Sequence, residues 1–405
     1  MSDKVESLSF QRDMFNDFDI ESPEFNERFD NVLNAMAAKC PMARSEVGHG
    51  YWVINRYADV KKAAQDWRTF SSARGYQLNR PEGAPVILPE ESDPPYHNDW
   101  RAVLNPYFSP STVGGYEAEI RAMANELIDK FVDSGKCNFV TDFSSQLPGM
   151  VFFNCIMGVP VEDLPELFEA IDKGTFGPPA ERPGWFVKVN DYLNDYLKKR
   201  SQEPPRGDVV DRVVEGVDRD GKPCSWEDKV AIVLDLVFGG LATTTHVMTA
   251  AMHYLATHEQ DRKDLASDLS LVAVAVEEFV RLFPPVVAPA RYVTKDVELG
   301  GVQLKAGDWV ALNYAAASRD PAVTPDPTTV DLRREQVVHS AFGVGVHRCL
   351  GSHLARLELK VTIEEFLRRI PEFGVPAGHK PSTETGQLRT MTSLELIFDP
   401  ATTRK

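Results

Sequence analysis

The sequence lacks several features that would place it in a common class of protein. Only five of its 405 residues are cysteine, they are scattered, and no two form a C-x-x-C pair, so we expect neither a disulfide framework nor a structural zinc site. The charged N-terminus has no apolar core, which predicts no signal peptide. Charged residues recur along the chain, and we therefore expect no transmembrane helix and a cytoplasmic protein.

The chain is also short of basic residues. It has 44 Lys and Arg against 60 Asp and Glu, a formal net charge of -16, which argues against nucleic acid or an anionic membrane as the main partner. Hydrophobic residues make up 43% of the chain, enough for a large core. Because we find no repeat, low-complexity tract or linker, we expect a single domain over residues 1–405.

Hydrophobic periodicity predicts a mainly α protein with small β-sheets, an α+β fold. Strand patterns occur in roughly residues 50–75, 286–312 and 388–399, the last as one final strand, and most of the rest is helical. The longest helix begins with a capping box formed by Ser225 and Asp228 and runs far beyond the usual helix length. It is apolar nearly all round, which predicts a position deep in the core.

One cysteine has an unusual setting, the loop "AFGVGVHRCLG" from Ala341 to Gly351. A thiolate that binds a metal needs nearby N–H donors and is favoured near a helix N-terminus, and a helix is expected directly after Cys349. The glycines of this loop let the backbone approach a flat ligand closely. From the loop alone, a structural thiol in a turn before a helix is an equally good interpretation.

The stretch "FGVGVHRCLG" fits the pattern F-G-x-G-x-H-x-C-x-G at every fixed position. It resembles the haem-thiolate loop of the cytochrome P450 family, and nearly the whole chain is similar to soluble bacterial members of the camphor-hydroxylase type. The resemblance implies the P450 fold, a long central helix over a buried haem b, and Cys349 as the axial ligand of the haem iron. It also implies that His347 binds a haem propionate, that Phe342 packs near the thiolate, and that Gly343 and Gly351 contact the cofactor.

Three further motifs follow in the order that this family has them. "EEFVR" carries an E-x-x-R pair, Glu278 and Arg281, whose implied role is structural. "HNDWR" gives His97 and Arg101, which match the propionate-binding H-x-x-x-R, and Arg291 falls where the family has a further propionate arginine. Taken alone, each of these pairs is an ordinary feature of a solvated helix. Two buried propionates nevertheless require fixed cationic partners, so the set is physically consistent.

The long helix departs from the family pattern at one position. In "FGGLATTTHV", Gly239, Gly240 and Thr243 match the family's Gly-rich break and oxygen-handling threonine, but Ala242 replaces the acid that normally supplies protons. Three explanations stay open. Thr243, Thr244 and ordered water carry protons by another route, a substrate group completes the relay, or the chemistry uses peroxide or is not hydroxylation. We favour the first and take Thr243 and Thr244 as the catalytic candidates.

Asp235 is a second unusual residue, because it lies in the apolar run "AIVLDLVFGG". It is seven residues from Ala242, about two helical turns, so the two share a face. A carboxylate there is costly unless it is paired or hydrogen-bonded. Three interpretations stay open. Asp235 is either a buried residue that bonds to a neighbouring helix or reaches solvent, or a group that recognises an amine or hydroxyl of the substrate. The third is a displaced proton donor, whose pKa would be raised by burial.

The resemblance also suggests which residues line the substrate pocket. A mostly apolar lining suits a small or medium hydrophobic substrate, and the loop from Tyr76 to Leu88 would form a lid. Besides Asp235, the implied pocket residues are Phe238, Leu241, Ala242, Val287, Pro289 and Leu388.

No flavin- or nicotinamide-binding segment is visible, so we expect a separate electron donor, a ferredoxin with its NAD(P)H-dependent reductase. It would dock on the proximal face near Cys349, where Arg68, Arg101, Arg348 and Arg356 could form a basic patch. Local salt bridges and propionate binding are the alternative role of these arginines.

The expected function is therefore a haem-thiolate monooxygenase that inserts one oxygen atom of O2 into a C–H bond, by hydroxylation or O-dealkylation. A peroxide-driven peroxygenase and a non-catalytic haem sensor or binding protein are the alternatives. Turnover with peroxide alone, or tight ligand binding without product, would distinguish them.

Overall fold

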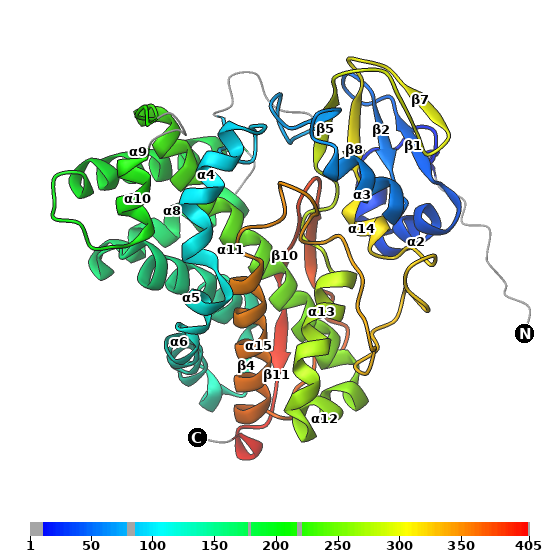
Figure 1. Ribbon diagram of the computed structural model, residues 1–405. Helices are drawn as coiled ribbons and strands as arrows, with labels where there is room; N and C mark the ends of the chain where they lie inside the picture. The colour runs from blue at the N-terminus through cyan, green and yellow to red at the C-terminus, as the bar shows by residue number, and fades with distance from the viewer. Residues whose placement is uncertain (1–10, 79–85, 177–179, 217–220, 404–405) are drawn as a thin grey trace, which may run out of the picture.

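The computed structural model describes residues 11–78, 86–176, 180–216 and 221–403. It confirms the expected fold class, mainly helical with small sheets: helices form most of the molecule, and the strands of the largest sheet gather at one end with α2, α3 and α14 (Figure 1). The helices are α1 Pro23–Glu27, α2 Phe29–Lys39, α3 Tyr57–Gln65, α4 Tyr96–Leu104, α5 Pro110–Gly114, α6 Glu117–Asp129, α7 Leu147–Val151, α8 Leu164–Phe176, α9 Arg182–Arg200, α10 Val209–Glu215, α11 Trp226–Thr257, α12 Glu259–Ser267, α13 Val272–Leu282, α14 Tyr314–Ala317 and α15 Ser352–Arg369.

The largest sheet has five strands in the order β1-β2-β8-β5-β3, and only the β2–β8 pair is parallel. The other strands form three two-stranded sheets, β6 with β7, β9 with β10, and β4 with β11. The bounds are β1 Met42–Ser45, β2 Tyr51–Ile54, β3 Phe70–Ser71, β4 Lys136–Asn138, β5 Ala290–Val293, β6 Val297–Leu299, β7 Val302–Leu304, β8 Trp309–Leu312, β9 Ser382–Thr385, β10 Arg389–Ser393 and β11 Glu395–Ile397.

The long helix α11 crosses the centre of the molecule, between α9 and α15 (Figure 1). The backbone N–H of Asp228 donates to Ser225 Oγ at 3.0 Å, as the capping box requires. Residues 236–258 contain no Asp, Glu, Lys or Arg, so charge is less evenly spread than we expected. Within the described ranges α11 alone has the length and hydropathy of a membrane span, but the protein itself buries most of that apolar window, as a core helix requires.

Three strand predictions were wrong in detail. The expected single final strand is two, β10 and β11, which pair with different partners. Strand β4 lies inside a stretch read as helical, and β1 lies outside the predicted strand ranges. Elements of three or four residues are too short for a hydrophobic period to identify, because their pairing is decided by distant segments.

A fully buried ion pair fixes the end of α13. Arg281 donates to Glu278 Oε1 from Nε at 2.7 Å and to Glu278 Oε2 from Nη2 at 2.9 Å. Arg281 also donates to the carbonyl oxygens of Pro327 and Thr329, and Glu278 accepts the backbone N–H of Asp331 at 2.9 Å. The pair therefore ties α13 to the long loop that leads to the cysteine.

We predict that Arg281→Met destabilises the fold by about 3–5 kcal/mol, because it leaves the Glu278 carboxylate buried without its main partner. Urea unfolding followed by circular dichroism measures this loss. Arg333→Met is the matched control, since Arg333 pairs with Asp264 on the surface, and its effect should stay below about 1 kcal/mol. Equal stability of Arg281→Met and the wild type would contradict a structural role for the pair.

Candidate active site

A cavity of about 620 Å³ lies between α11 and the loop that precedes α15. Residues from distant parts of the chain line it, from Tyr76 to Leu388. Helices α4, α9, α11 and α15 each contribute side chains. Most of the lining is apolar, and the polar groups are concentrated near Cys349 and along the face of α11.

The loop that carries Cys349 is held in a tight, glycine-dependent path. The backbone N–H of Cys349 donates to the carbonyl of Phe342 at 2.8 Å. Gly343 and Gly345 have φ angles of 66° and 79°, in the left-handed region that favours glycine. A Cβ at Gly345 would overlap the backbone carbonyl of Ala64 in α3, so the loop is packed directly on that helix. This packing directs Cys349 into the cavity wall.

The chemistry of Cys349 follows from its enclosure. Its side chain is exposed, but the surface that it exposes faces the cavity rather than bulk water. Burial of the site raises the pKa of the thiol, while the Gly351 backbone N–H and the charge of Arg101 oppose this effect. The chain alone therefore keeps a thiol, and a metal cation is what would stabilise the thiolate.

A cluster of cationic and imidazole groups lies beside the cysteine. His97 and His347 line the cavity with their ring centroids 4.3 Å apart. Arg101 also lines it and donates from Nη1 to the Arg348 carbonyl at 2.8 Å. Arg291 is buried, and its Nη2 is 3.8 Å from Glu90 Oε1, which faces the cavity.

This cluster has the properties of an anion site. Neither ring nitrogen of His347 has a hydrogen-bond partner among the described residues. Burial lowers the pKa of His97 to about 4 and also lowers that of His347, and the charge of Arg101 adds to both effects. A bound anion would instead raise the pKa of both imidazoles. The unpartnered imidazole, the two arginines and the enclosed thiol therefore fit a haem, whose two propionates need such partners.

The predicted catalytic residues Thr243 and Thr244 line the cavity, and so does Ala242, which precedes them on α11. Thr243 Oγ1 donates to the Gly239 carbonyl one turn earlier, at 2.7 Å. A Cβ at Gly240 would have no neighbour within 4 Å, so the helix surface is open there. Ala242 is buried and offers no titratable group. This part of the wall can hold water against backbone and hydroxyl oxygens but has no acid at position 242.

The structure places most, but not all, of the predicted pocket residues in the wall. Asp235, Phe238, Ala242, Pro289 and Leu388 line the cavity. Two expected residues do not: Leu241 packs into the largest hydrophobic cluster, and Val287 is fully buried in a second cluster behind the sheet. Of the expected lid, Tyr76, Gln77 and Ile87 line the cavity, and residues 79–85 lie outside the described residues.

The four arginines expected on the proximal face behave differently. Arg68 and Arg348 are exposed. Arg356 is not available as a free charge, because it donates from Nη2 to Glu277 at 2.9 Å and stacks on the ring of Phe342. We correct its assignment to a group that braces the cysteine loop. Arg101 faces the cavity.

Several wall residues were not predicted from the sequence. Glu90 lies in the wall, whereas its neighbour Glu91 accepts the backbone N–H groups of Tyr76 and Ile87. Phe186 of α9 stacks on Phe238 with centroids 4.7 Å apart. No local pattern separates Glu90 from Glu91 or marks Phe186, because their orientation depends on tertiary packing.

Glu358 of α15 is a second unpredicted acid in the wall, after Glu90. It is buried, and burial raises its pKa to about 8, so it is mostly protonated at neutral pH.

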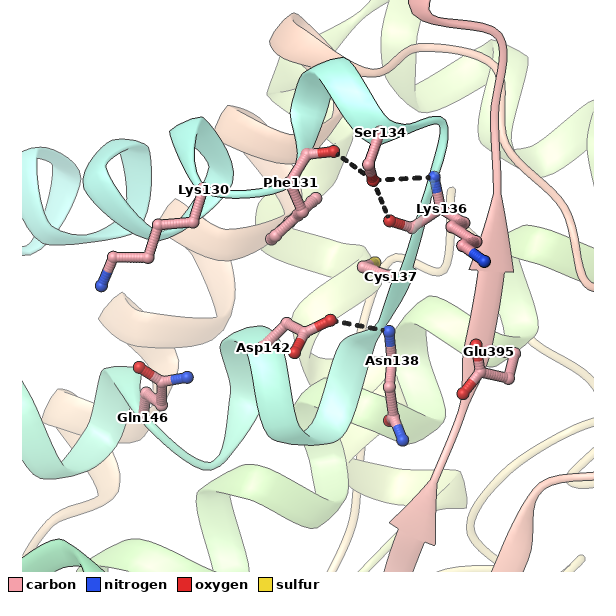
Figure 2. A pocket seen from close by; sticks show the side chains of 9 residues that line it. All are labelled: Lys130, Phe131, Ser134, Lys136, Cys137, Asn138, Asp142, Gln146 and Glu395. Atoms are coloured by element: carbon pink, nitrogen blue, oxygen red, sulfur yellow. Dashed lines mark hydrogen bonds between the residues drawn. The ribbon is translucent and has the colours of Figure 1, made fainter.

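A second hollow, of about 310 Å³, lies beside the β4–β11 pair and is shown in Figure 2. Its polar groups are largely paired with one another. Asp142 accepts the backbone N–H of Asn138 at 2.8 Å, and Ser134 donates to the Phe131 carbonyl at 2.8 Å (Figure 2). Burial raises the pKa of Cys137 in this hollow, which leaves the thiol unreactive. The cavity at Cys349 is therefore the candidate active site.

Comparison with known proteins agrees with this site. A family model described as Cytochrome P450 matches residues 183–395. The vitamin D(3) 25-hydroxylase of Pseudonocardia autotrophica is 31% identical over 354 residues, 85% of this chain and 87% of that protein. The mycinamicin IV hydroxylase/epoxidase of Micromonospora griseorubida is 30% identical, over 88% of this chain and 91% of that protein.

Solved structures show the same likeness. The crystal structure of CYP101J2 superposes with a TM-score of 0.83 at 31% identity, covering 96% of this chain and 97% of that one. That of CYP101C1 has a TM-score of 0.86 at 27% identity, covering 96% and 98%.

We predict that Gly345→Ala lowers the free energy of unfolding by about 2–4 kcal/mol, because the new Cβ meets the Ala64 carbonyl and the left-handed φ is unfavourable for alanine. Urea unfolding measures this loss. Gly114→Ala is the control, because a Cβ there has no neighbour within 4 Å, and it should change stability by less than about 1 kcal/mol. If both variants were as stable as the wild type, the loop would not be packed on α3.

Proposed function

The chain belongs to the cytochrome P450 family of haem b-binding monooxygenases, and from that premise we propose that it inserts one oxygen atom of O2 into a small or medium hydrophobic substrate. The reaction is a hydroxylation or an O-dealkylation, with electrons supplied by a ferredoxin. The observation that carries this proposal is the position of Cys349 in the wall of a largely apolar cavity, beside the buried imidazole of His347, whose ring nitrogens have no hydrogen-bond partner among the described residues.

Four of the residues that would hold haem b line the cavity, whereas Arg291 is not part of the lining and lies behind Glu90, at 3.8 Å from it. Cys349 would bind the iron, and His97, Arg101, Arg291 and His347 would pair with the propionates. When bound, haem supplies the site at which O2, two electrons and two protons yield one inserted oxygen atom and one water. Phe342, Gly343 and Gly351 would contact the cofactor without adding a charge.

We propose that protons reach the site along the hydroxyl face of α11. Thr243 Oγ1 is anchored on the Gly239 carbonyl, which leaves its oxygen lone pairs to accept a hydrogen bond from water. Thr244 lies next to it in the wall. With Ala242 in place of an acid, water held by these hydroxyls would move the protons that the family normally passes through a carboxyl group.

Ala242 also supports a second candidate, a peroxygenase. Peroxide brings its own electrons and protons, so an enzyme that uses it does not need a carboxylate relay at position 242. The two reactions are distinguished by whether the rate of product formation depends on an electron donor.

The proposed ferredoxin site is the surface over the cysteine loop. Arg68 and Arg348 are exposed there, and Arg68 stacks on Trp67. Positive side chains at this surface suit an acidic partner in spite of the net charge of -16.

We also propose that residues 1–405 work as a single domain in the cytoplasm. Residues 76 and 388 line one cavity, which supports one domain, and the relatives named above are bacterial P450 enzymes.

We predict that Cys349→Ala abolishes the red-shifted Soret band of the reduced carbonyl complex, because that band reports a thiolate on the iron. Absorption spectroscopy of the dithionite-reduced protein under carbon monoxide measures it. Cys349→His should retain haem and show the unshifted band of an imidazole ligand, which excludes a loss caused by misfolding. Cys40→Ala, a buried cysteine outside the cavity wall, is the control and should keep the shifted band.

The same preparations decide between the two reactions. Product formation with NADH, reductase and ferredoxin that exceeds the rate with hydrogen peroxide supports the monooxygenase. Equal or faster turnover with peroxide alone would favour the peroxygenase. An unchanged carbonyl spectrum in Cys349→Ala would contradict both.

We predict that Arg68→Glu and Arg348→Glu slow reduction by a [2Fe–2S] ferredoxin about tenfold at low salt, with a smaller effect at high ionic strength, because charge steering is screened. Stopped-flow absorption measures the rate. Arg212→Glu on α10 is the control, since Arg212 pairs with Glu215 on another flank of the molecule (Figure 1). Reduction by dithionite should be equal in all variants, and a ferredoxin rate unaffected by both substitutions would exclude this surface.

A further inference from the structure

The cavity contains a carboxylate without a partner. Asp235 lies on the cavity face of α11, and it has no hydrogen bond or ion pair with any residue that the structure describes. Its carboxylate lies over Gly239, where an added Cβ would be 3.8 Å from Asp235 Oδ1. Of the three interpretations open from the sequence, an Asp bonded to a neighbouring helix is therefore excluded within the described residues. The carboxylate is directed at whatever fills the cavity.

A second carboxylate faces the same space. Glu90 lies in the loop before α4, and its ion-pair partners among the described residues are Arg291 and His347, each at 3.8 Å, beyond hydrogen-bond distance. Both of these groups are the proposed partners of the haem propionates. Binding of haem would therefore leave Glu90, like Asp235, without a counter-charge.

The two acids are close enough to affect each other. Burial raises the pKa of Asp235 well above its usual value, and the negative charges of Glu90 and Glu91 add to this effect, while the positive charge of Arg101 opposes it. Burial also raises the pKa of Glu90, against the charges of Arg291 and Arg101. Two unpaired carboxylates that share an apolar cavity are unfavourable unless a proton or another cation lies between them.

Among the described residues, neither arginine of the wall forms a hydrogen bond or ion pair with Asp235 or Glu90, although the charge of Arg101 acts on both. Arg182 donates from Nη2 to Glu384 at 2.8 Å. Arg101 is directed at the Arg348 carbonyl and at Asn105. The wall also carries aromatic side chains, among them Tyr76 and the stacked pair Phe186 and Phe238. Aromatic rings and carboxylates together are the surroundings in which proteins bind ammonium groups.

We propose that the substrate of this enzyme is a compact hydrophobic amine, cationic at neutral pH, whose ammonium group binds between Asp235 and Glu90. This inference rests on the proposed monooxygenase function and names its substrate class. The hydrocarbon part of the substrate lies against Phe186 and Phe238, and the two acids fix its orientation over the cofactor. The same acids exclude carboxylate substrates of equal size, because like charges in an apolar cavity repel.

The test uses haem-loaded protein and sets of ligands that share one skeleton but differ in charge. Each set has a trimethylammonium cation, an alcohol and a carboxylate on a cyclohexyl, benzyl or adamantyl skeleton. A quaternary ammonium has no lone pair and cannot bind the iron, so its affinity reports the carboxylates alone. Isothermal titration calorimetry at neutral pH gives the dissociation constants.

We expect the cation to bind at least about tenfold more tightly than the alcohol of the same skeleton, and the carboxylate to bind most weakly. Asp235→Asn should remove about tenfold of the affinity for the cation and leave that for the alcohol within about twofold. Glu90→Gln should act in the same direction. Glu227→Gln, an exposed acid in the first turn of the same helix, is the matched control and should keep the full preference.

Equal affinity for cation and alcohol in the wild type, or an unchanged preference in both Asp235→Asn and Glu90→Gln, would overturn the proposal. Failure of every ligand to bind would overturn it as well, since the proposal requires compact cations to bind. The reduced carbonyl spectrum of the same samples distinguishes a failure of the substrate proposal from a failure of the proposed monooxygenase function. A thiolate spectrum without cation preference rejects the substrate class alone, whereas absence of that spectrum rejects the proposed function.

Discussion

One constraint organises this molecule: a cysteine must face an enclosed cavity at the point where the chain turns to begin a helix. The turn requires left-handed backbone at Gly343 and Gly345, and Gly345 has no room for a side chain against Ala64. The loop is braced from the other side by Arg356, which stacks on Phe342 and pairs with Glu277. The sheet end and the helical part of the molecule are therefore fixed to each other through the residues around the thiol.

The cavity itself combines two opposing requirements. Its apolar wall can hold a hydrophobic molecule away from water, but α11 and the loop before α4 place carboxylates in that wall. Unpaired acids reduce stability, so they persist where a ligand uses them. The buried Glu278–Arg281 pair illustrates the contrast, because there both charges are satisfied within the protein and serve the fold.

How much the sequence predicts depends on what fixes each residue. Cys349, His347, His97 and Arg101 were predicted to lie together through the resemblance to the P450 family, whose haem motifs have fixed residue types at fixed spacing, and the four do line one cavity. The position of Leu241 could not be predicted, since the wall covers most of the circumference of α11 and neighbouring elements decide which side chains it leaves open. For the same reason Glu90 and Glu91 could not be distinguished, and β1 and β4 are too short for periodicity to reveal.

The cavity wall begins at Tyr76 and ends at Leu388, only 17 residues before the chain's last residue. A ribosome delivers these segments in order, so the helices of the first half are complete long before the cysteine loop and the last wall residue exist. The wall that would enclose the cofactor is therefore complete only after Leu388 has been made. Until then no haem can cover the uncharged stretch of α11, residues 236–258. The nascent protein must therefore protect this stretch against aggregation by other means.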